Sequence, residues 1–577
     1  MTASPATLDA PSGEARSVHG SPGDAPPVAQ PNAAPSTPSG FSNEDDRAPT
    51  RWGEGLDRGG DLLNPILIKE VRQSFKSKQF LGSFWALLGV CWLIGACGLL
   101  FAGEAVEFGA VGGAFFTLFY SVLAFAVLLL VPYGAYRSVL NERLENTWEV
   151  LSVTALSPRQ IVLGKIACAA MQTLVYFSAV APFVAFCSLL QGFDPRTAAF
   201  FLAATAWGGV VASSFAVMLA SVVRQKVWQG LLAGALGTAL FGGVWLYIGS
   251  AFSGAMVQPL PFTEPAFIWT VLAAVAISAS YVVLFVNAAA AGLTFEADNR
   301  STAVRVTVTA QFWLMVAGIA GLYVARPDLL GAAALAALAA FALGHWLFWA
   351  IVFAAEPDEM SRRVRRGAPK SKFLRALAAP WLPGGSRGVL LIWLHVAAVA
   401  GLAAWARVAR APALELRISR PGSEVNGFGD LPASLSAGDP WLQGLYCGLA
   451  YVLIYTGLCA LAMRIGSAIL RDFPPVGARL IVLILGPMGL IPPTAARLMK
   501  FVRNDEATAL DALTPVLLFP ELASRGATFG HLALLGGLAL GAVVANLPFV
   551  FGQVRDLLRP PGSFAEPSTA RPAAASA

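Results

Sequence analysis

Residues 115–136 read FFTLFYSVLAFAVLLLVPYGAY and contain no charged side chain. At a rise of about 1.5 Å per residue, a helix of this length crosses the roughly 30 Å of hydrocarbon in a lipid bilayer. Similar apolar runs recur along the chain, and they predict about twelve membrane spans. The other runs are residues 80–102, 166–191, 197–223, 228–252, 267–294, 306–325, 329–355, 389–406, 441–463, 480–498 and 530–551.

The composition is typical of a membrane protein rather than a soluble one. Apolar residues make up 56% of the 577 residues and charged residues only 13%. The apolar runs show no alternation of polar and apolar residues, so they satisfy their backbones as helices and not as barrel strands. The predicted fold class is therefore all-α, a polytopic transmembrane helical bundle.

The distribution of Lys and Arg predicts the orientation in the membrane. The loop after the first span holds Glu104 and Glu107 but no Lys or Arg, whereas the segment before that span is basic. By the positive-inside rule, the N-terminus is cytoplasmic and the chain is a multi-pass protein of the cell inner (cytoplasmic) membrane. The net charge of +6 follows the topology and is not gathered in one domain, so we expect no nucleic-acid partner. The basic residues before the first span are Arg51, Arg58, Lys69, Arg72, Lys76 and Lys78.

The same rule interprets Arg305 and the basic residues within 362–387 as cytoplasmic anchors. The alternation weakens at residues 480–498. This segment either crosses the membrane fully or turns back at Pro492 and Pro493, and the side of the C-terminus depends on which is true.

The spans divide the chain into segments. Both ends are rich in Pro, Ala, Ser and Gly, a composition that cannot bury an apolar core. The predicted segments are a disordered N-terminal tail (1–60), an amphipathic interfacial helix (61–79), a six-span unit (80–295) with a polar loop (137–165), spans seven and eight (296–355), a basic cytoplasmic loop (356–388), C-terminal spans (389–555) with an extracytoplasmic loop (407–440), and a disordered C-terminal tail (556–577).

Residues 62–78 are predicted to form an amphipathic helix in the inner membrane interface. Pro65 suits the first helical position. Leu67, Val71 and Phe75 fall on one face of this helix, and cations fall on the opposite face and at its end, where they meet anionic headgroups. The membrane-interface candidates are Lys69, Arg72, Lys76 and Lys78.

The loop between the second and third spans is helical in pattern but too polar to be embedded. Glu142, Glu145 and Glu149 line one face, which we expect to face the cytosol. Ser157 then begins a second helix, with Gln160 placed for a capping box. The apolar residues of the loop share the opposite face: Leu140, Leu144, Trp148 and Leu151.

Two other loops carry patterns of their own. The basic loop at 356–388 is interpreted as a membrane anchor with an interfacial helix around residues 373–377; a docking or lipid-binding role is the alternative. In the outside segment at 407–440, apolar and polar residues alternate over 414–419, which predicts a short strand.

Residues 141–165, NERLENTWEVLSVTALSPRQIVLGK, resemble the first cytoplasmic loop of class-2 ABC exporter permeases, the type-2 exporters. With the helix before the first span, the resemblance covers residues 62–294, a six-span unit of the family's usual size. The chain departs from the family pattern at Leu144, Asn146, Trp148 and Ala155. The matching positions are Glu142, Arg143, Thr147, Glu149, Leu151, Leu156, Ser157, Gly164 and Lys165.

The resemblance implies that this loop is a coupling helix. In the family, such a helix sits in a groove of a cytosolic ABC ATPase subunit, and closure of the ATPases moves the spans. The resemblance further implies a homodimer or a sister permease in membrane lipids, with ATP-Mg bound on the partner ATPase and no cofactor on this chain. The candidate ATPase-coupling residues are Glu142, Arg143, Glu145, Thr147, Glu149, Ser157, Gly164 and Lys165.

Two common catalytic motifs, the phosphate-binding loop and H-E-x-x-H, are missing from the sequence. Gly164 and Lys165 are followed by Ile166, so they do not form the G-x-x-x-x-G-K-[ST] loop that cradles phosphates. There is no H-E-x-x-H motif, and the four histidines are isolated from one another in the sequence. We therefore expect a transport subunit and not an enzyme, with no catalytic or metal-binding residue. The six cysteines all fall in predicted spans and are interpreted as small buried residues.

Two functions are consistent with these patterns. The first is the permease subunit of an ABC transporter, coupling ATP hydrolysis by a separate subunit to substrate export. The alternative is an integral-membrane enzyme or scaffold that acts in envelope or lipid assembly without an ATPase. The substrate cannot be chosen from apolar spans alone.

Overall fold

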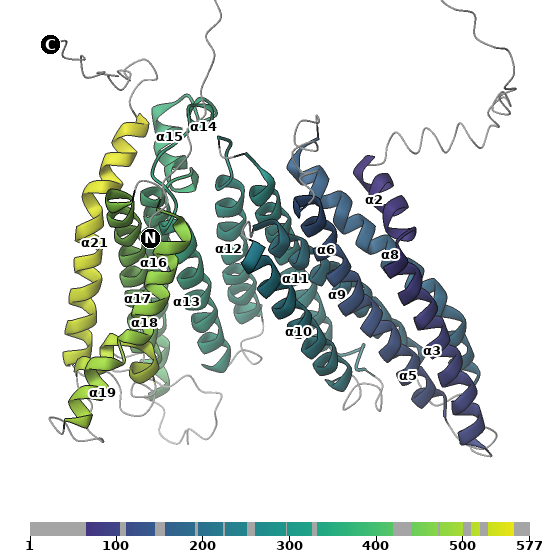
Figure 1. The fold of residues 1–577 in the computed structure, drawn as a ribbon. Coiled ribbons are helices and arrows are strands. Elements are labelled where there is room, and N and C mark those ends of the chain that lie inside the picture. The colour runs from purple at the N-terminus through teal and green to yellow at the C-terminus, as the bar shows by residue number, and fades with distance from the viewer. Residues whose placement is uncertain are drawn as a thin grey trace, which may run out of the picture. The chain divides into compact units, whose positions relative to one another are not determined.

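The structure, a computed structural model, describes residues 65–103, 111–144, 156–190, 194–222, 226–250, 260–295, 297–325, 332–418, 440–470, 473–499, 509–519 and 529–558. Within these ranges every regular element is a helix (Figure 1). The predicted all-α fold class is therefore confirmed for this part of the chain. Both predicted tails lie largely outside the described residues, although the last helix runs to Leu558.

Ten helices in the described ranges are long and apolar enough to cross a membrane, and the chain is a multi-pass membrane protein. The predicted number of twelve spans is not confirmed. Two of the expected spans are helices, α12 (Thr302–Ala325) and α13 (Ala332–Ala354), but they are not among the ten. The ten are Lys78–Phe101, Gly112–Glu142, Pro158–Leu189, Pro195–Val222, Gln229–Gly249, Pro265–Leu293, Gly385–Ala404, Gln443–Ile469, Pro475–Leu498 and Phe529–Leu558.

The first half of the chain packs around one apolar core, in which Phe119, Leu123 and Val127 are fully buried or nearly so. Helix α9 contacts both α6 and α11, and α8 contacts α2, α5 and α9. The helices of this half are α2 (Pro65–Phe75), α3 (Lys78–Ala102), α5 (Gly112–Phe125), the π-helical turn η1 (Ala126–Leu130), α6 (Val131–Leu144), α8 (Pro158–Leu189), α9 (Pro195–Val222), α10 (Lys226–Ser250) and α11 (Pro265–Leu293).

Local sequence signals start several of these helices. Ser77 caps α3, because its hydroxyl accepts a hydrogen bond from the backbone N–H of Phe80 at 3.1 Å. Pro65 is the first residue of α2, as predicted, and α2 ends at Phe75. The turn between α2 and α3 therefore includes Lys76.

The second half packs around a separate core that includes Phe312, Trp346 and Leu391, all fully buried. Helix α11 contacts both α9 of the first half and α12 of the second. The remaining elements are α14 (Arg362–Arg366), α15 (Lys372–Ala378), the 3₁₀ turn η3 (Ala379–Trp381), α16 (Gly385–Ile418), α17 (Pro440–Ile469), α18 (Pro475–Met488), α19 (Ile491–Leu498), the 3₁₀ turn η4 (Ala509–Leu513) and α21 (Phe529–Leu558).

The predicted strand at 414–419 is wrong. Helix α16 continues as far as Ile418, beyond the apolar run at 389–406. The sequence from Ala411 to Arg417 consists mostly of Ala, Leu, Glu and Arg, which are strong helix formers, and their propensity outweighs the short alternation. The rest of the predicted outside loop, residues 419–439, lies outside the described residues.

The segment at 480–498, predicted to be a span or a re-entrant turn, is a broken helix. Helix α18 has 14 residues and α19 follows after Gly489 and Leu490; together, Pro475–Leu498 spans 24 residues and is one of the ten segments long enough to cross the membrane. At the end of α21, the Leu557 carbonyl accepts a hydrogen bond from Arg375 Nη1 at 3.2 Å. The C-terminal end of α21 and the basic segment at 362–387 therefore lie on the same side of the bundle.

Candidate functional site

The start of α8 positions Lys165, a buried cation with three polar partners. Ser157 and Gln160 form the predicted capping box: the Ser157 backbone N–H donates to Gln160 Oε1 at 2.9 Å, and the Gln160 backbone N–H donates to the Ser157 hydroxyl at 3.4 Å. This fixes where α8 begins. Lys165 then falls two helical turns later, on the face that contacts α2 and α6.

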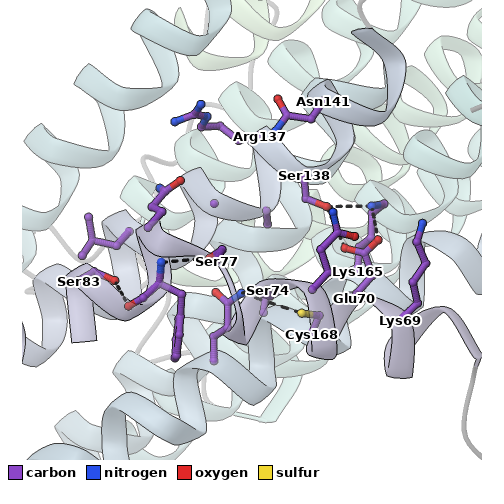
Figure 2. A pocket seen from close by; sticks show the side chains of 18 of the residues that line it. Lys69, Glu70, Ser74, Ser77, Ser83, Arg137, Ser138, Asn141, Lys165 and Cys168 are labelled. Atoms are coloured by element: carbon purple, nitrogen blue, oxygen red, sulfur yellow. Dashed lines mark hydrogen bonds and ion pairs between the residues drawn. The ribbon is translucent and has the colours of Figure 1, made fainter. Parts of the chain in front are cut away.

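Lys165 joins three helices through its ammonium group. Nζ lies 2.9 Å from Glu70 Oε1 of α2 and 2.9 Å from Glu142 Oε2 of α6, and it donates to the Ser138 hydroxyl of α6 at 2.9 Å. Ser138 in turn donates to Glu70 Oε2 at 2.9 Å. Figure 2 shows Lys165, Glu70 and Ser138 pointing toward one another. We call Lys165, Glu70, Glu142 and Lys69 the charge cluster.

The charge cluster is shielded from water and electrically balanced. The side chain of Lys165 is only 2% exposed, that of Glu70 9% and that of Glu142 13%. Lys69, which is half exposed, lies 3.5 Å from Glu142 and supplies the second positive charge. Burial of charge is costly, but two lysines against two carboxylates with an additional hydroxyl satisfy one another.

The pKa of Glu70 lies below its ordinary value. Burial is the largest single influence and opposes ionisation, but the neighbouring Lys165 charge and the hydrogen bonds from Lys165 and Ser138 together outweigh it. Glu70 is therefore ionised at neutral pH, as its ion pair requires.

A pocket of about 430 Å³ lies beside the charge cluster, between α2, the first turns of α3, α6 and α8. Its lining includes Arg137 and Asn141, which Figure 2 shows on α6 near the cluster. Ser83 and Tyr176 close another part of it through a hydroxyl pair at 2.7 Å. The cavity thus combines charged, amide, hydroxyl and apolar groups.

The structure accounts for some of the predicted coupling residues and not for others. Glu142 does not face solvent as the helical pattern predicted, because it turns toward Lys165. Ser157 is the helix cap, and Gly164 is buried on α8. Arg143 belongs to α6, but its side chain is not among the described parts of the structure. Glu145, Thr147 and Glu149 lie outside the described residues altogether.

The predicted interfacial cations lie on the exposed side of α2 and at the start of α3. Arg72, Lys76 and Lys78 are exposed, and Lys69 is half exposed. The protein-facing side of α2 differs from the predicted apolar stripe, because the buried residues are Ile66 and Glu70.

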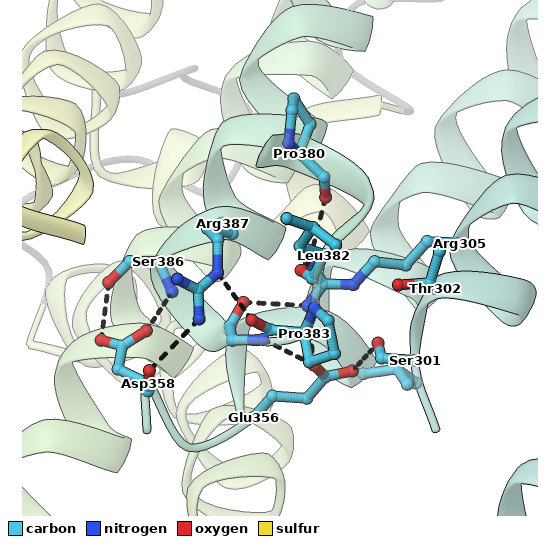
Figure 3. A network of polar contacts seen from close by, with 12 residues as sticks. Ser301, Thr302, Arg305, Glu356, Asp358, Pro380, Leu382, Pro383, Ser386 and Arg387 are labelled. Carbon is cyan, nitrogen blue, oxygen red and sulfur yellow. Dashed lines mark hydrogen bonds and ion pairs between the residues drawn. The ribbon is translucent and has the colours of Figure 1, made fainter. Parts of the chain in front are cut away.

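A second polar network lies in the other half of the chain and centres on Arg305 (Figure 3). Arg305 is fully buried. Its guanidinium donates to Glu356 Oε2 at 2.7 Å and to three backbone carbonyls, those of Pro380, Leu382 and Gly384, at 3.0, 2.6 and 2.9 Å. Arg305 thereby holds the connection between α15 and α16 against α12 and the end of α13.

The same network continues through Asp358 to α17 and α21. The Ser386 backbone N–H and hydroxyl each donate to the Asp358 carboxylate at 2.6 Å. Arg464 of α17 donates to the Ser386 hydroxyl at 2.9 Å and bonds Asn546 of α21. Gly384 is required here, since its φ of 130° is unfavourable for other residues and a Cβ would lie 2.5 Å from the Arg387 guanidinium.

Sequence reasoning missed both buried networks at their key positions. Glu70 lies in a helix that its pattern predicts to be interfacial. The positive-inside rule predicts that Arg305 and Arg387 are cytoplasmic anchors, not buried residues. One sequence feature does point to burial of Glu70. It is an acid within a basic helix, and it shares a helix face with Gln73 rather than with Lys69 and Arg72.

The histidines at 345 and 395 and the cysteines, which could in principle carry chemistry, are packed against other side chains. His345 and His395 lie in an aromatic cluster, with the His395 ring 4.1 Å from the Trp346 ring between centroids. Five of the six cysteines are buried, as predicted, whereas Cys97 is only partly buried; all six are free thiols. No group of three or more potential metal ligands occurs among the described residues.

The fold and its polar networks define a polytopic α-helical membrane protein with a charge cluster and a pocket at one end of its first helices. Comparison of the chain with protein-family models, curated proteins and solved structures found no match.

Proposed function

We propose that this chain is the transmembrane permease subunit of an ABC transporter, in which a separate cytosolic ATPase drives export. The observation that carries the proposal is the pair of ion pairs made by Lys165 with Glu70 and Glu142. Glu142 and Lys165 lie on either side of the segment at 145–155, whose sequence resembles a coupling helix. The proposal places this segment and the N-terminus in the cytoplasm, in a homodimer or beside a sister permease.

The charge cluster supports a lever mechanism. Because Lys165 ties α8 to both α6 and α2, a force on the segment between α6 and α8 acts on three helices together. The buried ion pairs resist separation of these helices, since breaking one leaves an uncompensated charge. ATP binding to the partner would then shift the bundle between two packings, with the ATPase as the ligand that distinguishes them.

The alternative, a membrane enzyme or scaffold acting without an ATPase, depends on chemistry in the second half. Both carboxylates of that network are engaged: Glu356 accepts from Arg305 and Ser301, and Asp358 accepts from Ser386. These contacts favour a structural role for the network, so we do not adopt the alternative.

Affinity purification from the host membrane tests the proposal. The full chain, extracted in mild detergent, is expected to bring down a protein with an ATP-binding cassette. Reversal of charge at Glu149 (Glu149→Lys) should weaken this complex, whereas Glu359→Lys, at an exposed position in the loop after α13, should not. Isolation of the intact chain without any ATPase, under conditions that preserve other membrane complexes, would contradict the proposal.

A further inference from the structure

The pocket beside the charge cluster changes character along its length. Lys69, Glu142 and Lys165 line it at the charge cluster, and its lining away from the cluster includes Phe80 and Leu130 beside the hydroxyl pair of Ser83 and Tyr176. Leu130, the last residue of η1, lies about 18 Å from Glu142 of α6 along the helix axis, at the usual rise per residue. The cavity therefore runs from the polar end of the bundle into its apolar part, a shape that suits an amphiphile better than a small ion.

The charged end of the pocket carries one more positive than negative group. Its cations are Lys69, Arg137 and Lys165, and its anions are Glu70 and Glu142. Both carboxylates are engaged by the two lysines. Arg137 is exposed and makes no hydrogen bond or ion pair with any residue in the part of the chain that the structure describes. One unbalanced guanidinium at a cavity mouth favours one anionic group.

Two neutral amide side chains line the same pocket as this guanidinium. Gln73 of α2 and Asn141 of α6 line the same pocket and are exposed, so their amides can bond a polar ligand without breaking internal contacts. The outer face of α2 adds Arg72 and Lys76, which raise the local concentration of anionic headgroups at a membrane surface. A volume of about 430 Å³ falls in the usual range of small-molecule sites and admits a headgroup with part of its chain.

We propose that this pocket binds one anionic phospholipid. Its phosphodiester oxygens accept hydrogen bonds from Arg137, its headgroup hydroxyls bond Gln73 and Asn141, and the first part of an acyl chain lies against Phe80 and Leu130. This inference goes beyond the proposed transport function and does not depend on an ATPase partner. It assigns a lipid site where α2 meets α6 and α8.

Two variants test the site, each with a matched control. Gly134 lines the pocket, and a Cβ built there meets no atom within 4 Å, so Gly134→Leu places an apolar side chain at the cavity wall with room for its first carbon. Gly89→Leu is its control, because Gly89 also has open space but does not line the pocket. Arg137→Gln removes the guanidinium, and Arg159→Gln removes an exposed cation elsewhere on α8.

The measurement is lipid binding to the full chain in detergent by native mass spectrometry, with phosphatidylglycerol, phosphatidylcholine or inorganic phosphate added. We expect one tightly bound phosphatidylglycerol, about tenfold weaker binding in Arg137→Gln, and loss of binding in Gly134→Leu. Both controls should bind as the unchanged protein does. Phosphatidylcholine should bind more weakly, and inorganic phosphate should not displace the lipid.

Three results would overturn the proposal. The first is unchanged phosphatidylglycerol binding in both pocket variants. The second is equal binding of the zwitterionic lipid, which removes the argument from the unbalanced charge. The third is displacement by inorganic phosphate alone, which would assign the site to a free anion. Because Arg137 is exposed, Arg137→Gln keeps the test valid even if Gly134→Leu lowers the yield of folded protein.

Discussion

The ammonium nitrogen of Lys165 lies 2.9 Å from Oε1 of Glu70, a residue 95 positions earlier in the chain. This pair joins the short helix before the first span to the third span, and Glu142 joins the end of the second span to the same lysine. One buried ammonium group therefore ties α2, α6 and α8 together.

Replacement of Lys165 should lower the stability of the folded protein. Lys165→Met removes the buried ammonium group from between Glu70 and Glu142, and we expect a loss of about 3 kcal/mol in stability. The measurement is thermal unfolding in detergent. The double variant Lys165→Met with Glu70→Gln should recover part of the loss, because it removes one uncompensated charge. Equal stability of Lys165→Met and the unchanged protein would contradict the assigned ion pairs.

The Glu70 pair should also make stability depend on pH. The pKa of Glu70 is lower in the folded protein than its ordinary value of 4.5, so its ionised form stabilises the fold above that pH. The contribution is lost as the pH falls through the folded-state pKa. The difference in thermal midpoint between the unchanged protein and Glu70→Gln should therefore be constant from neutral pH to about pH 5 and shrink below 4.5. If the difference in thermal midpoint grows as the pH falls, the lowered pKa assigned to Glu70 is contradicted.

The Arg305 network should fix the connection between α15 and α16. Arg305→Met removes the donors to Glu356 and to the carbonyls of residues 380, 382 and 384, and we expect a loss of about 3–5 kcal/mol and faster proteolysis between α15 and α16. Arg363→Met is the control, because Arg363 is 76% exposed and its pair with Asp298 contributes less than about 1 kcal/mol. Similar proteolysis of the two variants would count against a structural role for Arg305.

Close packing of α9 against α11 gives a test of the first-half core. A Cβ at Gly292 would lie 2.5 Å from the Ser221 carbonyl oxygen, so Gly292→Ala should separate the helices and cost about 1–3 kcal/mol. At Gly82 a Cβ meets nothing within 4 Å, and Gly82→Ala should be neutral or slightly stabilising because Ala favours a helix. The thermal midpoint of Gly292→Ala should fall, and that of Gly82→Ala should stay unchanged or rise. Equal midpoints of the two variants would contradict the close contact of α9 and α11.

Features set by local sequence could be predicted well. The capping box at Ser157 depends on residues within one helical turn, and the helices at the predicted spans depend on the length of each apolar run. The strand at 414–419 failed because a six-residue alternation is weak against the helix propensity of Ala, Leu, Glu and Arg.

Features set by distant contacts could not be predicted. Periodicity placed Glu142 on a solvent face, but its partners Lys165 and Lys69 come from other helices. The positive-inside rule describes where arginines lie along the membrane normal and says nothing about burial, so it could not distinguish the fully buried Arg305 from the exposed Arg363.

The most direct test of the central claim is site-specific photo-cross-linking in cells. A photoreactive residue at Thr147, within the segment that resembles a coupling helix, is compared with one at Thr263, in the exposed turn before α11. The account predicts an adduct between Thr147 and an ATP-binding-cassette ATPase, and none from Thr263. Absence of an ATPase adduct at Thr147, with the protein folded and in the membrane, would contradict it.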